Sequence, residues 1–224
     1  MEKMKEKVWK FGLVFLALGW GFGSLGLVWA QSQPLLAPAS ASPQLARRSW
    51  NQDFSLTQSS SARLDAIKAV FQGKHPRAAK ALRAAFLQEP HASIRAWMVR
   101  AEDHASPGHL KFLAAALKDS DVFVREAAVV ALGESGKPQA VSDLAALLSS
   151  ETDPGARMTV CFWLGQLGGS QAVSALSQVL SSDKDPNIRL QAAQSLKKIG
   201  TGAALSALSQ AAHDPNSRVR EAAR

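Results

Sequence analysis

The chain has 224 residues, of which 46% are hydrophobic and 20% are charged, with a formal net charge of +8 and one cysteine. This composition excludes a wholly disordered chain, and a single cysteine excludes an internal disulfide. Cys161 stands in an apolar helical stretch, so we expect a buried small hydrophobe rather than a reactive thiol. Stability must therefore come from packing.

The first 30 residues have the pattern of a secretory signal peptide. Four lysines precede an uncharged apolar run over 11–30, which ends in Val28-Trp29-Ala30. A basic start, an apolar core and a small residue before the cut are the features that export signals share. We expect cleavage after Ala30 and an exported chain, periplasmic or otherwise extracytoplasmic. The alternative is an uncleaved anchor in the inner membrane, because about 20 apolar residues can span a bilayer.

Residues 31–60 are rich in proline, serine and alanine and contain few large apolar residues. Such a composition is typical of a flexible linker, and we expect no helix in it. The repeat domain is then expected over 61–224.

The next segment combines a degenerate helix pair, expected over 61–71 and 77–87, with an excess of basic residues. Residues 31–118 hold twelve basic and five acidic side chains, whereas 119–224 hold ten and eleven. A positive surface of this kind could bind an acidic protein, an anionic membrane surface or a polyanion of the cell envelope. The alternative is an ordinary solvated helix face. Without interleaved aromatic residues, nucleic acid is not expected. The partner-binding candidates are Lys74, Arg77, Lys80 and Arg83.

Four of the five histidines lie between positions 75 and 109. If the helices pair as described, His75, His104 and His109 lie in turns on one edge, where Glu102 or Asp103 could help to hold a metal. Their spacing matches no standard zinc signature, and histidines in turns are ordinarily solvated. We therefore expect no metal and no cofactor, and these three histidines stay weak metal candidates.

An apolar or small residue followed by arginine recurs along the second half of the chain. The arginines are Arg95, Arg125, Arg157, Arg189 and Arg220, which are 30, 32, 32 and 31 residues apart. A period in this range is typical of stacked helical repeats.

Each repeat also carries the signals that begin and end a helix. Asp121, Asp153 and Asp185 are placed to cap helix N-termini, and a glycine follows each helical stretch. Second helices are expected over 139–148, 171–180 and 203–211, where apolar residues recur every three to four positions. One repeat alone could not bury both of its faces, so the repeats must stack.

The repeated arginines have two possible roles. They could form a ladder for phosphate or carboxylate ligands, but each follows an acidic turn and precedes a similar repeat. We therefore expect them to pair with carboxylates of the same or the adjacent repeat. We expect the residues of the acidic row to be helix caps, and a cation site is the second possibility. That row is Asp119, Asp121, Asp153, Asp185 and Asp214.

These units resemble the HEAT-like repeat of the phycobilisome-lyase type, most closely over 119–224. The matching positions in one repeat are Ile188, Arg189, Ala192, Leu196, Ile199 and Gly200. The resemblance implies an all-α, right-handed α-solenoid of about five stacked helix pairs.

The expected function is a non-catalytic, exported scaffold for protein–protein interaction in the cell envelope. The alternative is a repeat-built enzyme, either a bilin lyase or a metal-dependent hydroxylase. Related hydroxylases hold two irons with His-Glu pairs, and this sequence has no His-Glu dipeptide. We therefore expect that the chain is not an enzyme.

Overall fold

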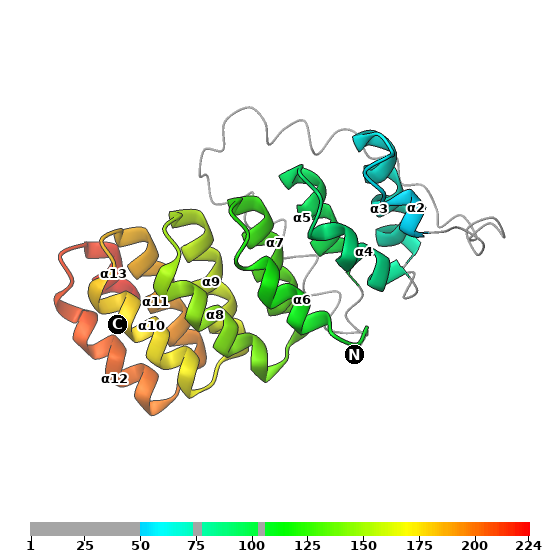
Figure 1. Cartoon of the computed structure of the whole chain (residues 1–224). Coiled ribbons are helices and arrows are strands. Elements are labelled where there is room, and N and C mark those ends of the chain that lie inside the picture. The colour runs from blue at the N-terminus through cyan, green and yellow to red at the C-terminus, as the bar shows by residue number, and fades with distance from the viewer. Residues whose placement is uncertain (1–49, 74–77, 103–105) are drawn as a thin grey trace. The chain divides into compact units, whose positions relative to one another are not determined.

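The computed structural model describes residues 50–73, 78–102 and 106–224 (Figure 1), and no strand occurs in those ranges. The α-helices are α2 (Trp50–Asp53), α3 (Ser60–Gly73), α4 (Ala79–Phe86), α5 (Ala92–Ala101), α6 (His109–Ala116), α7 (Val122–Ser135), α8 (Pro138–Ser150), α9 (Pro154–Leu167), α10 (Ser170–Ser182), α11 (Pro186–Ile199), α12 (Gly202–Gln210) and α13 (Ser217–Ala222). One turn of 3₁₀ helix, Ala211–His213, follows α12.

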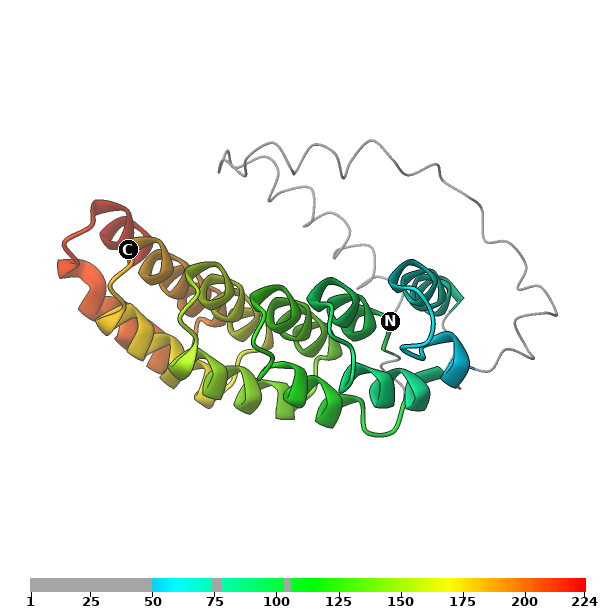
Figure 2. The same cartoon turned by 45° about the horizontal axis from the view of Figure 1, so that its top comes forward.

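Successive helices from α3 to α12 form five pairs within the described residues, and α13 begins a further unit. The first helices of the pairs, α3, α5, α7, α9 and α11, contact one another in that order and form one layer, which α13 extends. In the second layer α6, α8, α10 and α12 follow one another in the same way. Figure 2 shows the two rows. This α-solenoid confirms the all-helical repeat architecture expected from the sequence.

The helix boundaries follow from capping. Asp121 Oδ1 accepts the backbone N–H of Phe123 at 2.9 Å, and Asp153 and Asp185 cap α9 and α11 in the same way. These bonds satisfy amide groups that have no partner inside the helix. At the other end of α7, Gly136 has φ +62°, a left-handed conformation that is sterically unfavourable for a residue with a side chain.

Small residues let the first helices of the C-terminal repeats approach closely. A Cβ at Gly133 would lie 2.0 Å from the Trp163 ring, and one at Gly165 would lie 2.6 Å from Ser195. Ser195 Oγ also donates to the backbone oxygen of Cys161 at 2.9 Å, which joins α11 to α9. The layer is therefore fixed by close backbone approach as well as by apolar burial.

The second helices of the N-terminal repeats are short and pack through large side chains. Helices α4 and α6 have eight residues each, against 13 in α8 and α10. Phe86 of α4 and Phe112 of α6 pack edge to face, with ring centroids 5.0 Å apart. Aromatic packing of this kind fills the space between the two short helices.

The structure corrects the expected linker at its C-terminal end. Within 31–60, where no helix was expected, α2 covers Trp50–Asp53 and Phe54 is only 3% exposed. Phe54 belongs to the apolar core, so burial of one large ring holds this segment against the repeats.

The expected signal peptide, 1–30, and the rest of the expected linker lie outside the described residues. Among the helices that are described, none has the length and apolar character of a membrane span.

Candidate functional site

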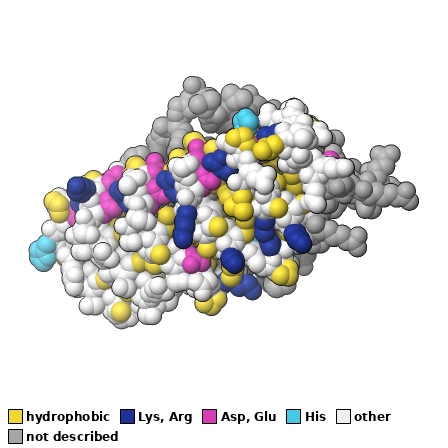
Figure 3. Space-filling view, viewed as in Figure 1, with side chains coloured by type: hydrophobic (Ala, Val, Ile, Leu, Met, Phe, Trp, Pro, Cys, Tyr) yellow, Lys and Arg dark blue, Asp and Glu magenta, His cyan; other side chains and the backbone are white. Residues whose placement is uncertain are grey.

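A ladder of ion pairs joins each repeat to the next. In every pair an arginine on the first helix of one repeat binds the carboxylate that precedes the first helix of the following repeat. The pairs are Arg63 with Glu89 (2.8 Å), Arg95 with Asp119 (2.7 Å), Arg125 with Glu151 (2.7 Å), Arg157 with Asp183 (3.1 Å) and Arg189 with Asp214 (2.8 Å). Figure 3 shows much of this row as alternating dark-blue and magenta side chains.

Each ladder arginine also binds the turn of its own repeat. Arg125 Nε and Nη2 donate to Glu151, while Nη1 donates to the backbone oxygens of Asp119 and Ser120 at 2.9 and 3.0 Å. Arg220 makes the same two backbone contacts, to Asp214 and Pro215. An arginine used in this way crosslinks two turns and has little freedom to bind a ligand.

Four of the five ladder carboxylates are held in their ionised form by lowered pKa values. Hydrogen bonds from Arg125, aided by backbone N–H groups, lower the pKa of Glu151, and Arg189 lowers the pKa of Asp214 in the same way. Burial raises the pKa of Glu89, but its hydrogen bonds, first from Arg63, outweigh burial and leave a lowered pKa. The pKa of Asp119 is lowered by the same balance. The ladder is therefore a set of charge-assisted crosslinks.

Sequence reasoning missed Arg63 and assigned some acidic residues to the wrong role. Asp119 and Asp214, expected as helix caps, are ladder carboxylates, and Asn216 caps α13. Two signals were available. Arg63 stands 32 residues before Arg95, and a carboxylate stands six residues before each later arginine.

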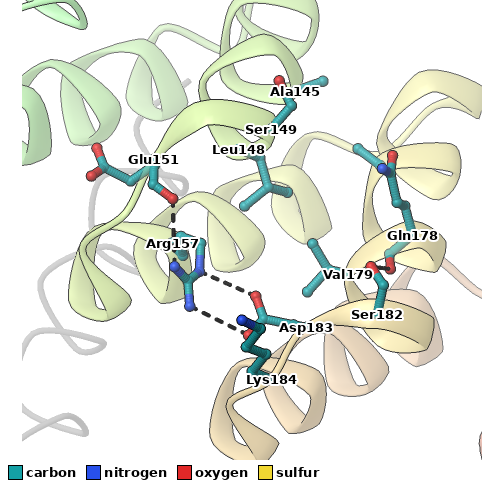
Figure 4. Close-up of a pocket in the computed structure, with 11 residues that line it drawn as sticks. Ala145, Leu148, Ser149, Glu151, Arg157, Gln178, Val179, Ser182, Asp183 and Lys184 are labelled. Atoms are coloured by element: carbon teal, nitrogen blue, oxygen red, sulfur yellow. Dashed lines mark hydrogen bonds and ion pairs between the residues drawn. The ribbon is translucent and has the colours of Figure 1, made fainter.

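Open hollows lie between the second helices of neighbouring repeats, beside the ladder. The first hollow, of about 380 Å³, lies between α8 and α10, with Leu148 and Val179 on its floor and Arg157, Asp183 and Lys184 on its rim (Figure 4). A second hollow, of about 640 Å³, lies one repeat earlier between α6 and α8. Its lining has the same elements, which are Leu117, Leu147, Arg125, Glu151 and Lys118.

These hollows are the candidate functional site. Each has an apolar floor from the second helices and a polar rim that the ladder holds in place. Because they recur at the spacing of the repeats, they can contact successive parts of one extended partner.

The predicted basic surface is only partly present. Lys80 is exposed on α4, whereas Lys74 and Arg77 lie outside the described residues. Arg83, expected on the same solvated face, instead binds the buried carboxylate of Glu102, whose side chain is 0% exposed. A buried carboxylate requires a cation, so Arg83 is a structural residue and not a partner-binding candidate.

The predicted histidine cluster is also corrected. His109 was expected in a solvated turn, but it is the first residue of α6, is 4% exposed, and places Nδ1 4.0 Å from Glu102 Oε1. His75 and His104 lie outside the described residues. In the described part of the chain, no three histidine, cysteine or acidic side chains are grouped as metal ligands. Cys161 is buried, and burial raises the pKa of its thiol to about 12.

Comparison with known proteins identifies the repeats. HEAT repeats match residues 80–159 and 143–224, and a search of curated proteins gave no match. The chain is similar to human deoxyhypusine hydroxylase in complex with glycerol, with 25% identity, coverage of 78% of this chain and 69% of that one, and a TM-score of 0.48.

Two other solved structures are similar at lower identity. An engineered protein is 19% identical, with coverage of 78% and 92% and a TM-score of 0.51. A designed armadillo repeat protein is 16% identical, with coverage of 78% and 95% and a TM-score of 0.45.

The hydroxylase corrects the expectation that the chain is not an enzyme. That protein, 25% identical to this chain, is an enzyme, and a fold does not by itself determine function. HEAT and armadillo repeats commonly mediate protein–protein interaction. Because the HEAT-repeat matches span 80–224, more than half of the sequence, the chain belongs to the HEAT-repeat family.

Proposed function

We propose that the chain is an exported scaffold that binds a protein partner in the cell envelope along its HEAT repeats. The observation that carries this proposal is the pair of open hollows that recurs with the repeats beside the fixed ladder. A surface of this form suits an extended partner, because each repeat offers a similar apolar floor and a similar charged rim.

The charge of the N-terminal repeats supports an acidic partner. The carboxylates of Glu89, Glu102 and Asp119 are used by arginines inside the array. Five basic side chains of the described N-terminal repeats form no ion pair, and dark-blue side chains off the ladder gather over α4 and α6 in Figure 3. They are Lys68, Lys80, Arg100, Lys111 and Lys118. Such an excess attracts an acidic protein surface.

Export and the repeat subtype belong to the same proposal. Export is supported by the lysine-led apolar start and by Val28-Trp29-Ala30. N-terminal sequencing of the mature chain should begin at Gln31, and an intact Met1 in an envelope fraction would indicate an anchor instead. The repeat motif supports the phycobilisome-lyase subtype of HEAT-like repeat.

The binding test blocks the hollows without disturbing the core. Ser149 and Ser150 are exposed and line the first and second hollow, respectively. Ser149→Trp and Ser150→Trp should reduce crosslinking of the full chain to its envelope partner at least tenfold while leaving the thermal midpoint unchanged. Ser181→Trp is the matched control, because Ser181 is exposed on α10 and lines neither hollow.

The alternative of a metal-dependent enzyme is tested by measuring metal bound to the purified chain. Elemental analysis of the purified full chain that found about one or two irons or zincs per chain would replace the scaffold proposal with a metalloenzyme. Unchanged crosslinking in both tryptophan variants would remove the hollows as the binding site.

A further inference from the structure

A partly exposed aromatic pair lies on the first-helix layer, on helices that do not line the hollows. Phe71 of α3 and Trp97 of α5 pack edge to face, with ring centroids 5.8 Å apart and an interplanar angle of 80°. Lys68 Nζ lies 5.8 Å from the centroid of the Trp97 ring, and Arg100 Cζ lies 6.0 Å from that centroid. These four residues form the aromatic–cation cluster.

The rings of this cluster are both accessible and fixed. Phe71 is 48% exposed although it packs against Trp97. Trp97 packs against the apolar core, so its indole is held in one place while part of it stays accessible. A fixed aromatic surface loses little conformational entropy when a partner binds.

The two cations differ from the other basic groups around them. Arg63, Arg83 and Arg95 of the same repeats all bind carboxylates of a neighbouring turn. Lys68 and Arg100 form no ion pair with any described residue and lie over the indole instead.

Two carboxylates lie in the neighbourhood of these cations. Asp65 is exposed on α3, one turn before Lys68. Glu126 of α7 interacts electrostatically with Arg100 but does not form an ion pair with it. Neither carboxylate forms an ion pair with these cations, so Lys68 and Arg100 stay available to carboxylates of a partner.

We propose that the aromatic–cation cluster is the docking site for an acidic protein segment that carries a large apolar side chain. The apolar side chain packs on Phe71 and Trp97, and carboxylates on either side of it pair with Lys68 and Arg100. This inference rests on the proposed function and assigns the partner's chemistry. Tryptophan and arginine are the residues that most often dominate protein interfaces.

A protein segment fits the cluster better than a membrane does. Segments that bind anionic lipid surfaces typically carry about four to eight clustered cations, and among the described residues two cations lie over the ring of this pair. Two cations beside one apolar contact instead match a short segment that alternates acidic and apolar residues.

The test uses the full chain and a fluorescein-labelled peptide with glutamates around a central Leu-Phe. A matched peptide has glutamine in place of glutamate. Fluorescence anisotropy should show that the Lys68→Gln/Arg100→Gln double variant weakens binding of the acidic peptide about tenfold. The control is Lys137→Gln/Lys197→Gln, which removes the same charge from exposed sites that line neither hollow and should change the affinity less than about twofold.

A second measurement localises the contact. The indole N–H resonance of Trp97, assigned from the spectrum of Trp97→Phe, should shift on addition of the acidic peptide and stay in place with the glutamine peptide. Phe71→Ser should weaken binding without lowering the thermal midpoint, because Phe71 is half exposed.

Three outcomes would overturn the inference. They are equal binding of the two peptides, equal effects of the two double variants, and a Trp97 shift caused by phosphatidylglycerol vesicles but not by the acidic peptide. Loss of the envelope partner on blocking the hollows, with full binding in Lys68→Gln/Arg100→Gln, would reject this docking site and leave the scaffold proposal in place.

Discussion

The N-terminal repeats, α3 to α6, and the C-terminal repeats, α7 to α12, share one ladder but pack in different ways. Before Lys118, short second helices are joined by the Phe86–Phe112 pair, and Arg83 and Glu102 form an additional buried ion pair. After Lys118, long capped helices approach closely at glycines such as Gly165. The same architecture is therefore built once from large side chains and once from small ones.

This difference shows where sequence variation is tolerated. The ladder fixes the turn between consecutive repeats, because its arginine binds both turns at once. The helix surfaces can then diverge. The N-terminal repeats carry Lys68 and Arg100 beside the Trp97 ring, whereas α7 has Ala127 and Val130 at the positions of Trp97 and Arg100 relative to the ladder arginine. A working surface in the N-terminal repeats is consistent with that divergence.

Acid should destabilise the N-terminal and the C-terminal repeats alike, because the ladder of ion pairs runs through both regions. The folded chain holds the pKa of Glu89, Asp119, Glu151 and Asp214 below ordinary values. Their stabilising effect is fully present above the unfolded pKa values of about 4 and is lost as the pH falls through the lower folded values. This is the largest expected effect, since four pairs weaken together.

Circular dichroism melting measures it. The thermal midpoint should stay level between about pH 7 and pH 5 and fall steeply below about pH 4, in one transition for both regions. A midpoint that stays level down to about pH 3, or a separate transition of one region, would contradict a continuous ladder.

The sequence predicted the repeats well because capping and periodicity act locally. Asp121, Asp153 and Asp185 each precede a helix at the expected residue. Long helices with apolar stripes also have one plausible buried face.

The burial of single polar residues was not predictable in the same way. Arg83 and His109 were assigned to solvent, but both lie against Glu102, which comes from another turn. Phe54 follows a segment of linker-like composition and is nevertheless buried. Each of these contacts depends on how the chain folds back between turns or onto the core, and local sequence pattern does not show it.

Removing one ion pair of the ladder should destabilise the chain more in the N-terminal repeats than in the C-terminal repeats. Arg63→Ala leaves Glu89 buried, with its side chain 1% exposed, and should lower the free energy of unfolding by about 3–5 kcal/mol. Arg157→Ala should cost less, about 1–3 kcal/mol, because Asp183 is 9% exposed and its contact is longer. Urea titration at pH 7 measures both values. Equal decreases in the free energy of unfolding would show that burial of the carboxylate does not determine how much a ladder ion pair stabilises the fold.

A glycine substitution tests the close packing of the C-terminal repeats. Alanine normally stabilises a helix interior relative to glycine by about 1 kcal/mol. At Gly165 the added Cβ would lie 2.9 Å from the backbone of Ser195, so Gly165→Ala should instead destabilise by about 1–3 kcal/mol. Gly202→Ala is the control, because nothing lies within 4 Å of a Cβ there, and its change should stay within about 0.5 kcal/mol. A stabilised Gly165→Ala would mean that α9 and α11 can separate freely.

The smallest effect concerns Glu126, which lies where the two regions meet. Burial raises its pKa, and the nearby Asp153 and Glu151 raise it further, while Arg100 lowers it. A raised folded pKa means that the fold favours the protonated acid, so this stability is present at low pH and lost as the pH rises through the folded pKa.

At pH 7 the ionised Glu126 therefore opposes folding, and Glu126→Gln should stabilise the chain by about 0.5 kcal/mol, a gain that vanishes near about pH 4. Glu134→Gln, on the exposed side of the same helix, should change nothing. If Glu126→Gln lowers the stability at pH 7, the carboxylate has a favourable partner in the fold. If it raises the stability, Arg100 has also lost a competing carboxylate, and the acidic peptide should bind more tightly to this variant than to the parent chain.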